Sequence, residues 1–489
     1  MAGDEEGVAL YDYLLERASV PFFEMLGAWL YRGVCSDPYG DEFMVRELPQ
    51  MSKEELTTDF NCAYWQRRFL LAREQVPAFL EPLANTILDC GKYLHIVREC
   101  GQSPSNPAAS RTPLQYSADH RKLRLAIEAA REWASALVLE LMIGEQRLMA
   151  RLASIKHYFL LDQGDFFVHF LDSAEEELVK PVSQISRGRL HSKLELSLRQ
   201  AAISDPYKES LSCDLLPYNL TNQLLRIINA ARATATPHEQ QQAERTPGLD
   251  AFTFDYKVQW PLSLVLSKNA ITKYQLLFRH LFHCKHVERQ LSSSWLSQQE
   301  GKALPSAVFS SSYGLRQRML HFLQNIEYYM MFEVLEPNWH MLKLRLQAAR
   351  RVDELISHHQ DFLDVCLKEC MLRDAVLLKL LAKLLTICVI FADQTRLVMG
   401  KVSEVLALHP LDTYGPRRRE QRATLMGKVE DTISGFNHYV KVQKLGARFD
   451  EELRRLLEEL RKQAHKEWNL AHLCSRLDYN NYWQQYRLQ

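Results

Sequence analysis

Two short stretches of the sequence bring histidine and cysteine close enough together to suggest a metal site. The side chains are His280, His283, Cys284 and His286 in the first stretch, and His358, His359, Cys366 and Cys370 in the second. Spacings of three and four residues place side chains on a common side of a helix. A zinc site, however, draws its ligands from several turns or elements, and the sequence has no second ligand pair at a familiar spacing. Packed core side chains are therefore the favoured interpretation. A metal-dependent enzyme that uses the His280–His286 helix is the alternative.

The commonest catalytic motifs are missing from the sequence. It has no Walker phosphate-binding loop, no GxGxxG after a strand, no GxSxG and no HExxH. We therefore predict that the chain is not an enzyme and that it holds no cofactor and no metal.

Six cationic side chains fall on a predicted helix over residues 268–296 and at the start of the next helix. They are Lys273, Arg279, Lys285, Arg289, Arg316 and Arg318. A charged helix face is usually just solvated, but it can also dock an acidic partner, where charge speeds the encounter and sets the register. The whole chain has 60 basic and 60 acidic residues, so its net charge gives no reason to expect a nucleic acid as a partner.

The composition indicates a reducing compartment. The ten cysteines are scattered without a CxxC pair, which is typical of free, buried thiols. The N-terminus, Met1 to Leu15, is acidic and lacks an apolar signal core. The most apolar run, Leu377 to Ala392, is shorter than a bilayer span and contains two lysines, so it predicts a buried helix. We predict a cytoplasmic chain that does not use a membrane as a partner.

The elements that would position these side chains are mostly helices, and the stretch from Leu315 to Pro337 gives the clearest pattern. Its apolar residues recur at steps of three and four, which places them on one helix face: Leu315, Met319, Leu323, Ile326, Met330 and Val334. Pro337 predicts a stop or a kink after this helix. We assign Phe278, Phe282, Phe322 and Met330 to the core.

The same periodicity predicts helices along most of the remaining chain. The main helical stretches are residues 117–161, 164–178, 268–296, 350–372, 375–399 and about 417–474. Residues 252–260 alternate between apolar and polar positions and give the only convincing strand, and residues 297–313 are predicted to form a loop. The expected fold class is all-α, with stacked helical bundles and at most a minor β element.

Six blocks of the chain resemble, in the same order, the gamma-tubulin complex component family. The blocks are Ser19–Val45, Tyr93–Gly101, Ser154–Leu178, Phe254–Ser267, Tyr274–Leu291 and Leu315–Trp339. The resemblance runs from about Tyr11 to Met399 and returns at Ser475–Trp483. Six blocks in the family's order are far more specific than any single motif above.

This resemblance implies an elongated rod in two halves, residues 1–152 and 153–489. In the family, the N-terminal half packs beside a neighbouring component, component 3 in particular, and the far end of the C-terminal half binds one gamma-tubulin. The assembled ring is a template for microtubule growth at microtubule-organising centres, namely the centrosome and the spindle pole. By this resemblance the chain is expected to be a non-enzymatic scaffold whose N-terminal half is shorter than in the family.

The resemblance also gives the six cations an expected role. They lie in the matching blocks, and proteins of the tubulin family are acidic, so Lys273, Arg279, Lys285, Arg289, Arg316 and Arg318 are our candidates for contact with gamma-tubulin. A helical adaptor that binds partners without binding tubulin remains an alternative.

Overall fold

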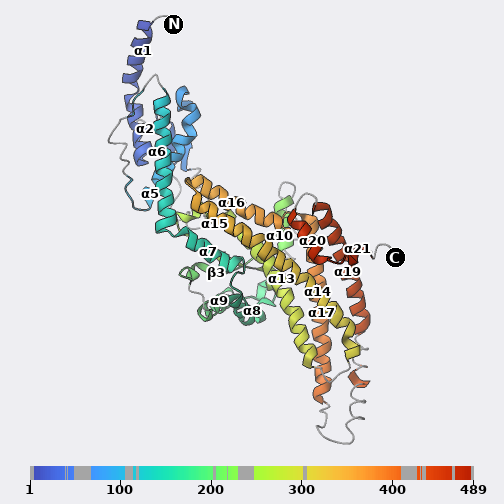
Figure 1. The fold of residues 1–489 in the computed structure, drawn as a ribbon. Helices are drawn as coiled ribbons and strands as arrows, with labels where there is room; N and C mark the ends of the chain where they lie inside the picture. The colour runs from blue at the N-terminus through green and yellow to red at the C-terminus, as the bar shows by residue number, and fades with distance from the viewer. Residues whose placement is uncertain are drawn as a thin grey trace.

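Helices dominate the computed structural model, which has the elongated shape seen in Figure 1. The structure describes residues 5–38, 40, 42–48, 68–104, 114–116, 120–201, 205–216, 218–229, 247–300, 306–408, 427–429, 431, 437–464 and 468–485. Within these residues the only sheets are two antiparallel pairs of short strands. The predicted all-α fold class with a minor β element is therefore confirmed.

The N-terminal end of the molecule is a small bundle built around Trp29. Its helices are α1 (Glu5–Ala18), α2 (Val20–Arg32), α5 (Ala84–Glu99) and α6 (His120–Glu140), joined by the short turns η1 (Arg73–Gln75) and η2 (Ala78–Leu83). The indole of Trp29 is fully buried and donates a hydrogen bond of 2.9 Å to the carbonyl of Ile87. It lies so close to Gly91 that a Cβ there would come within 1.9 Å of the ring, so α2 and α5 can pack this tightly only because residue 91 is glycine. Strands β1 (Val45–Glu47) and β2 (Phe69–Leu71) cover the same core.

The predicted long helix over residues 117–161 is wrong as a single element. Helix α6 ends at Glu140, a π-helical segment η4 (Leu141–Glu145) follows, and α7 (Leu148–Phe159) begins after Arg147, whose φ is +48°. A non-glycine residue in this left-handed region costs free energy and breaks the helix direction. The sequence keeps an apolar period through the break, so the period alone did not reveal it.

The middle of the molecule combines short helices with the second sheet. Helix α8 (Gly164–Leu178) has the predicted bounds, and it is followed by η5 (Val182–Gln184), α9 (Arg187–Gln200), η6 (Lys208–Ser210), α10 (Leu220–Asn229), α12 (Gly248–Ala251) and η7 (Leu262–Leu264). Strand β4 (Phe252–Tyr256) pairs with β3 (Leu211–Leu215), so the expectation of a lone strand reaching residue 260 is wrong. Both Phe252 and Phe254 of β4 pack against Phe170 of α8, which ties the sheet to the helices.

Long helices make up the rest of the molecule. They are α13 (Lys268–Glu300), α14 (Ser306–Tyr328), α15 (Glu336–Ala348), α16 (Val352–Glu369), α17 (Ala375–Leu408), α19 (His438–Ala464), α20 (Trp468–Leu477) and α21 (Tyr482–Gln485). The predicted loop over 297–313 is too long, because α13 extends to Glu300 and α14 starts at Ser306. Pro337 does not stop the helix: the π-helical segment η8 (Tyr329–Leu335) leads directly into α15, and Pro337 is the second residue of α15. The π-helical segment interrupts the regular hydrogen-bond ladder just before the proline.

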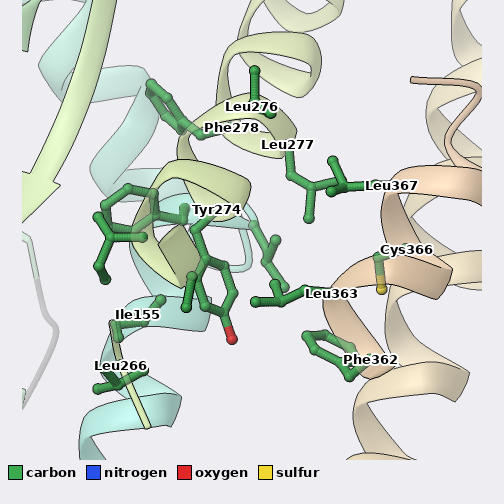
Figure 2. Close-up of a cluster of buried hydrophobic side chains, with 14 of the residues drawn as sticks. Ile155, Leu266, Tyr274, Leu276, Leu277, Phe278, Phe362, Leu363, Cys366 and Leu367 are labelled. Carbon is green, nitrogen blue, oxygen red and sulfur yellow. The ribbon is translucent and has the colours of Figure 1, made fainter. Parts of the chain in front are cut away.

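Helix α13 is the central element of the core. Figure 2 shows Tyr274 of α13 between Ile155 of α7 and Leu363 of α16. Tyr274 is fully buried, and its hydroxyl lies 3.0 Å from Nε2 of His359. Phe278, Phe282, Phe322 and Met330 are all buried, so their assignment to the core is confirmed.

Helix α17 contains one stretch, Ala375–Val405, that is long and apolar enough to cross a membrane by length and composition alone. Of its most apolar window, 44% is buried inside the structure, and core helices of water-soluble proteins pass the same test. Leu381, Leu384, Cys388 and Phe391 face the main core. This burial agrees with the predicted packed helix, although the helix is longer than the sequence indicated.

Candidate partner-binding surfaces

The two histidine and cysteine stretches lie in helices, and their side chains serve the core. His280, Cys284 and His286 are buried on α13, while the ring of His283 lies 3.5 Å from a carboxylate oxygen of Asp250. Burial lowers the pKa of His280 and of His286 to about 4, so both imidazoles are neutral at pH 7. Across the described part of the chain, no group of three or more histidine, cysteine, aspartate or glutamate side chains is arranged to hold a metal ion.

The second stretch has a similar role in packing. His359 is fully buried and faces Tyr274, while Cys366 and Cys370 are buried in the main core. Burial raises the pKa of both thiols far above that of an exposed cysteine, which keeps them protonated and unreactive.

Arg279, the second of the six predicted contact cations, lies inside the protein. Its side chain is only 3% exposed, and its guanidinium donates hydrogen bonds to Oε1 of Gln223 at 2.5 Å and to the carbonyls of Tyr218 at 2.5 Å and Asp250 at 2.6 Å. Burial lowers the pKa of Arg279 to about 10, against the opposing charge of Asp250, so the group stays charged at pH 7. The candidate contact residue Arg279 is therefore not on the surface, because two distant segments, residues 218–223 and the segment with Asp250, provide the acceptors that enclose it.

Three further cations are partly exposed, and each is paired within the chain. Lys273 lies 2.9 Å from Asp364, and Lys285 lies between Glu288 at 2.9 Å and Glu327 at 2.5 Å. Arg289 contacts the carboxylate of Asp172 on α8. All three are on α13, where Lys285 and Arg289 are one turn apart but Lys273 lies 12 residues, about 18 Å, before Lys285, so the three do not form one compact patch.

The last two cations lie on α14 and face different neighbours. Arg316 places its guanidinium 4.5 Å from the ring centre of Trp295 on α13, a cation–π contact. Arg318 binds both carboxylate oxygens of Asp450 on α19 at 2.8 Å, and its side chain remains 44% exposed. These two arginines therefore help to hold α13, α14 and α19 together while leaving part of their surface open.

The α13–α14–α17–α19 bundle has a free end, where α13 and α17 finish and α14 and α19 begin (Figure 1). We call this region the distal end. It has a hydrophobic cluster of its own, separate from the main core, made of Val398, Met399, Val402 and Val429 with Tyr313 and Val405 packed against it. A small separate cluster stabilises its region less than a large core does, because less apolar surface is buried.

Large apolar side chains also reach the surface of the helices that form the distal end. Leu397 on α17 is 67% exposed, and Tyr439 and Val440 on α19 are 57% and 46% exposed. Sequence reasoning missed all three. Leu397 follows four polar residues beyond the apolar run Leu377–Ala392, and Tyr439 and Val440 lie in the predicted charged helix over about 417–474, so no local apolar pattern marks any of the three as exposed.

At the opposite end of the molecule, α1 carries a second exposed apolar surface. Leu10, Tyr11, Leu14 and Leu15 are all about half exposed. Spacings of one, three and four residues place them on one side of the helix. Figure 1 shows α1 extending beyond the rest of the N-terminal bundle.

Comparison with known proteins identifies the family of this chain. The family model described as "Gamma tubulin complex component C-terminal" matches residues 148–483, and the one described as "Gamma tubulin complex component N-terminal" matches residues 1–145. The chain belongs to the gamma-tubulin complex component family.

Individual members of the family are similar over most of the chain. Gamma-tubulin complex component 2 of Mus musculus is 42% identical over 98% of this chain and 55% of its own length, and that of Arabidopsis thaliana is 42% identical over 84% of the chain and 60% of its own length. Spindle pole body component alp4 of Schizosaccharomyces pombe is 34% identical over 88% of the chain and 62% of its own length. The chain thus spans a little over half the length of these curated relatives.

The two family models meet at a distinctive place in the structure. One ends at residue 145 and the other starts at residue 148, which are the last residue of the π-helical segment η4 and the first residue of α7. Between them lies Arg147 with its positive φ.

Proposed function

We propose that this chain is a scaffold subunit of a gamma-tubulin complex and that its distal end binds gamma-tubulin. The observation that carries the proposal is membership of the gamma-tubulin complex component family over both the N-terminal and the C-terminal models. In this role the chain acts at microtubule-organising centres, the centrosome or the spindle pole, where bound gamma-tubulin templates microtubule growth. No described feature favours catalysis, so any nucleotide chemistry in the complex belongs to gamma-tubulin.

The surface chemistry of the distal end supports its assignment as the gamma-tubulin contact. Leu397, Tyr439 and Val440 are exposed there. Tyrosine is enriched among the residues that dominate the binding energy of protein interfaces, and the leucine and valine add apolar surface that a partner can bury. Arg316 and Arg318 lie on the adjoining helix and add positive charge that suits an acidic partner. Of the six cations chosen from the sequence, these two remain in the proposed contact. Arg318 is paired as well, with Asp450, but its side chain is 44% exposed. Lys273, Lys285 and Arg289 are paired and less exposed, at 28%, 39% and 32%, which favours structural roles for them, as burial does for Arg279.

The N-terminal half is proposed to provide lateral contacts with neighbouring components, component 3 in particular. We divide the chain at residue 152, so that residues 1–152 form the lateral half and residues 153–489 the gamma-tubulin-binding half. The apolar side of α1 supports the lateral role, because isolated exposed apolar residues are common but an aligned set on one helix is typical of an interface. Neighbours held side by side convert several weak gamma-tubulin contacts into one stable array.

The direct test is binding of purified gamma-tubulin to Tyr439→Asp and Leu397→Asp. Each change places a charge in the proposed contact, and we expect each to weaken binding about tenfold or more, since losing an interface anchor costs about 2 kcal/mol. The matched control is Tyr479→Asp, at a residue 86% exposed beyond α20, at the other end of α19 (Figure 1). Wild-type affinity in folded Tyr439→Asp and Leu397→Asp proteins would refute the proposed contact, as would an equal loss in the control.

A further inference from the structure

The first residues of helix α16 contact helices α5 and α6 of the N-terminal half. The backbone N–H of Val352, the first residue of α16, donates a hydrogen bond of 3.0 Å to the hydroxyl of Ser135 on α6. The first N–H groups of any helix lack partners within that helix, and an oxygen close by in sequence usually accepts from them. Here the acceptor is 217 residues away and is almost completely buried.

The next residue of α16, Asp353, makes two side-chain contacts across this junction. Its carboxylate accepts a hydrogen bond from the hydroxyl of Tyr93 on α5 and another of 2.9 Å from Nη2 of Arg131 on α6. A carboxylate in the first turn of a helix is also stabilised by the helix dipole. Burial and the bond to Asp353 raise the pKa of Tyr93, so its hydroxyl keeps the proton that it donates.

The groups around Asp353 form one connected cluster. Arg131 also lies 3.7 Å from Asp89 on α5, and Arg351, just before α16, reaches Glu132 on α6 at 3.4 Å. Burial and the nearby charge of Asp353 raise the pKa of Asp89, and Arg131 opposes this effect. We call the set Tyr93, Arg131, Ser135 and Asp353 the latch.

The chain connection between the same two regions is irregular. It passes through the π-helical segment η4 and then Arg147 at φ +48°. Both features interrupt the regular ladder of helix hydrogen bonds, and such interruptions are where helices bend. Hinges between domains are typically a few residues of this kind that absorb the change in backbone angles, and a contact elsewhere between the two regions limits that change.

We propose that the latch fixes the angle between the N-terminal bundle and the long helices of the C-terminal half, with η4 and Arg147 as the hinge. The latch residues are then positioning residues, because they set where the distal end points relative to the lateral face. The importance of this angle for templating rests on the proposed function, but the angle itself is a property of the isolated chain.

The experiment measures the distance distribution between spin labels on Glu128 of α6 and Lys343 of α15, attached through non-natural amino acids so that the native cysteines stay unlabelled. Asp353→Ala and the milder Ser135→Ala are compared with Asp361→Ala, which removes an exposed carboxylate from α16 away from the junction. We expect a broadened and shifted distribution for Asp353→Ala, a smaller broadening for Ser135→Ala, and the wild-type distribution for Asp361→Ala.

A structural role limited to local stability would lower the melting temperature of Asp353→Ala without moving the label distances, and that result would overturn the latch. Wild-type distances in folded Ser135→Ala together with folded Asp353→Ala would overturn it as well. Gamma-tubulin affinity measured on the same variants is expected to stay at the wild-type value, because the distal end is unchanged. The label distances can therefore refute the latch without refuting the gamma-tubulin contact, and the affinity measurements can refute the contact without refuting the latch.

Discussion

Two arginine-bearing regions of this protein had the same appearance in the sequence but have opposite environments in the structure. In the middle of α13, Arg279 is buried and donates to three acceptors from two other segments. In the middle of α14, Arg318 is 44% exposed and pairs with one carboxylate on α19. The first arginine holds the fold together from inside, and the second is available to a partner.

The difference shows that a cluster of positive charge in a sequence does not locate a binding surface. The two arginines differ because distant segments bury Arg279, whereas Arg318 remains partly exposed. At the distal end, apolar side chains are exposed as well. Leu397 and Tyr439 lie at the surface of the helices that enclose the small separate hydrophobic cluster. The predictions below test this contrast between an internal and a peripheral role.

The largest effect is expected for Arg279→Met. The change removes the donor for two backbone carbonyls and one amide oxygen that are then left buried, and breaking such an arrangement costs about 3–5 kcal/mol of unfolding free energy. Urea denaturation followed by circular dichroism measures the loss. The control is Arg345→Met, at an exposed position on α15, which should stay within about 0.5 kcal/mol of wild type. Equal stability of the two variants would contradict an internal role for Arg279.

A smaller, pH-dependent effect is expected from His280. Burial holds its pKa at about 4, below the value of 6.5 for an exposed histidine, so the unfolded chain binds a proton between these values that the folded chain does not. The folded state therefore loses stability as pH falls from about 6.5 towards 4. In His280→Leu the loss between pH 7 and pH 5 should be smaller by about 2 kcal/mol.

Urea titrations at the two pH values check the histidine prediction. The exposed His340→Gln is the matched control, and its dependence on pH should be that of wild type. An unchanged dependence in His280→Leu would show that His280 is not a buried neutral imidazole in the folded protein.

The smallest effect on stability is expected for Arg318→Ala. A partly exposed ion pair contributes about 0.2–1 kcal/mol, so the variant should unfold close to the wild-type urea midpoint. A double-mutant cycle with Asp450→Ala measures the interaction between the two side chains. A loss as large as that of Arg279→Met would remove the distinction between the internal and the peripheral arginine.

The sequence predicted correctly those helices and core residues that follow from an uninterrupted apolar period. Helix α8 was predicted with its observed bounds because its apolar period is uninterrupted, and Phe278 and Phe322 were assigned correctly to the core. Strand β3 was missed because Leu211 and Leu215 enclose three residues without a clear alternation, and only its pairing with β4 makes it a strand.

Features that depend on distant segments were not accessible from the sequence. The partners of Arg279 lie 29 to 61 residues away, so its burial has no local signal. The latch joins residues more than 200 positions apart.

The most direct test of the gamma-tubulin assignment is hydrogen–deuterium exchange of the purified chain with and without gamma-tubulin. The account predicts slower exchange on binding in peptides around Leu397, Tyr439 and Arg316–Arg318, with no change in α1 or at the latch. Protection confined to other regions, with the distal end exchanging as in the free chain, would contradict it.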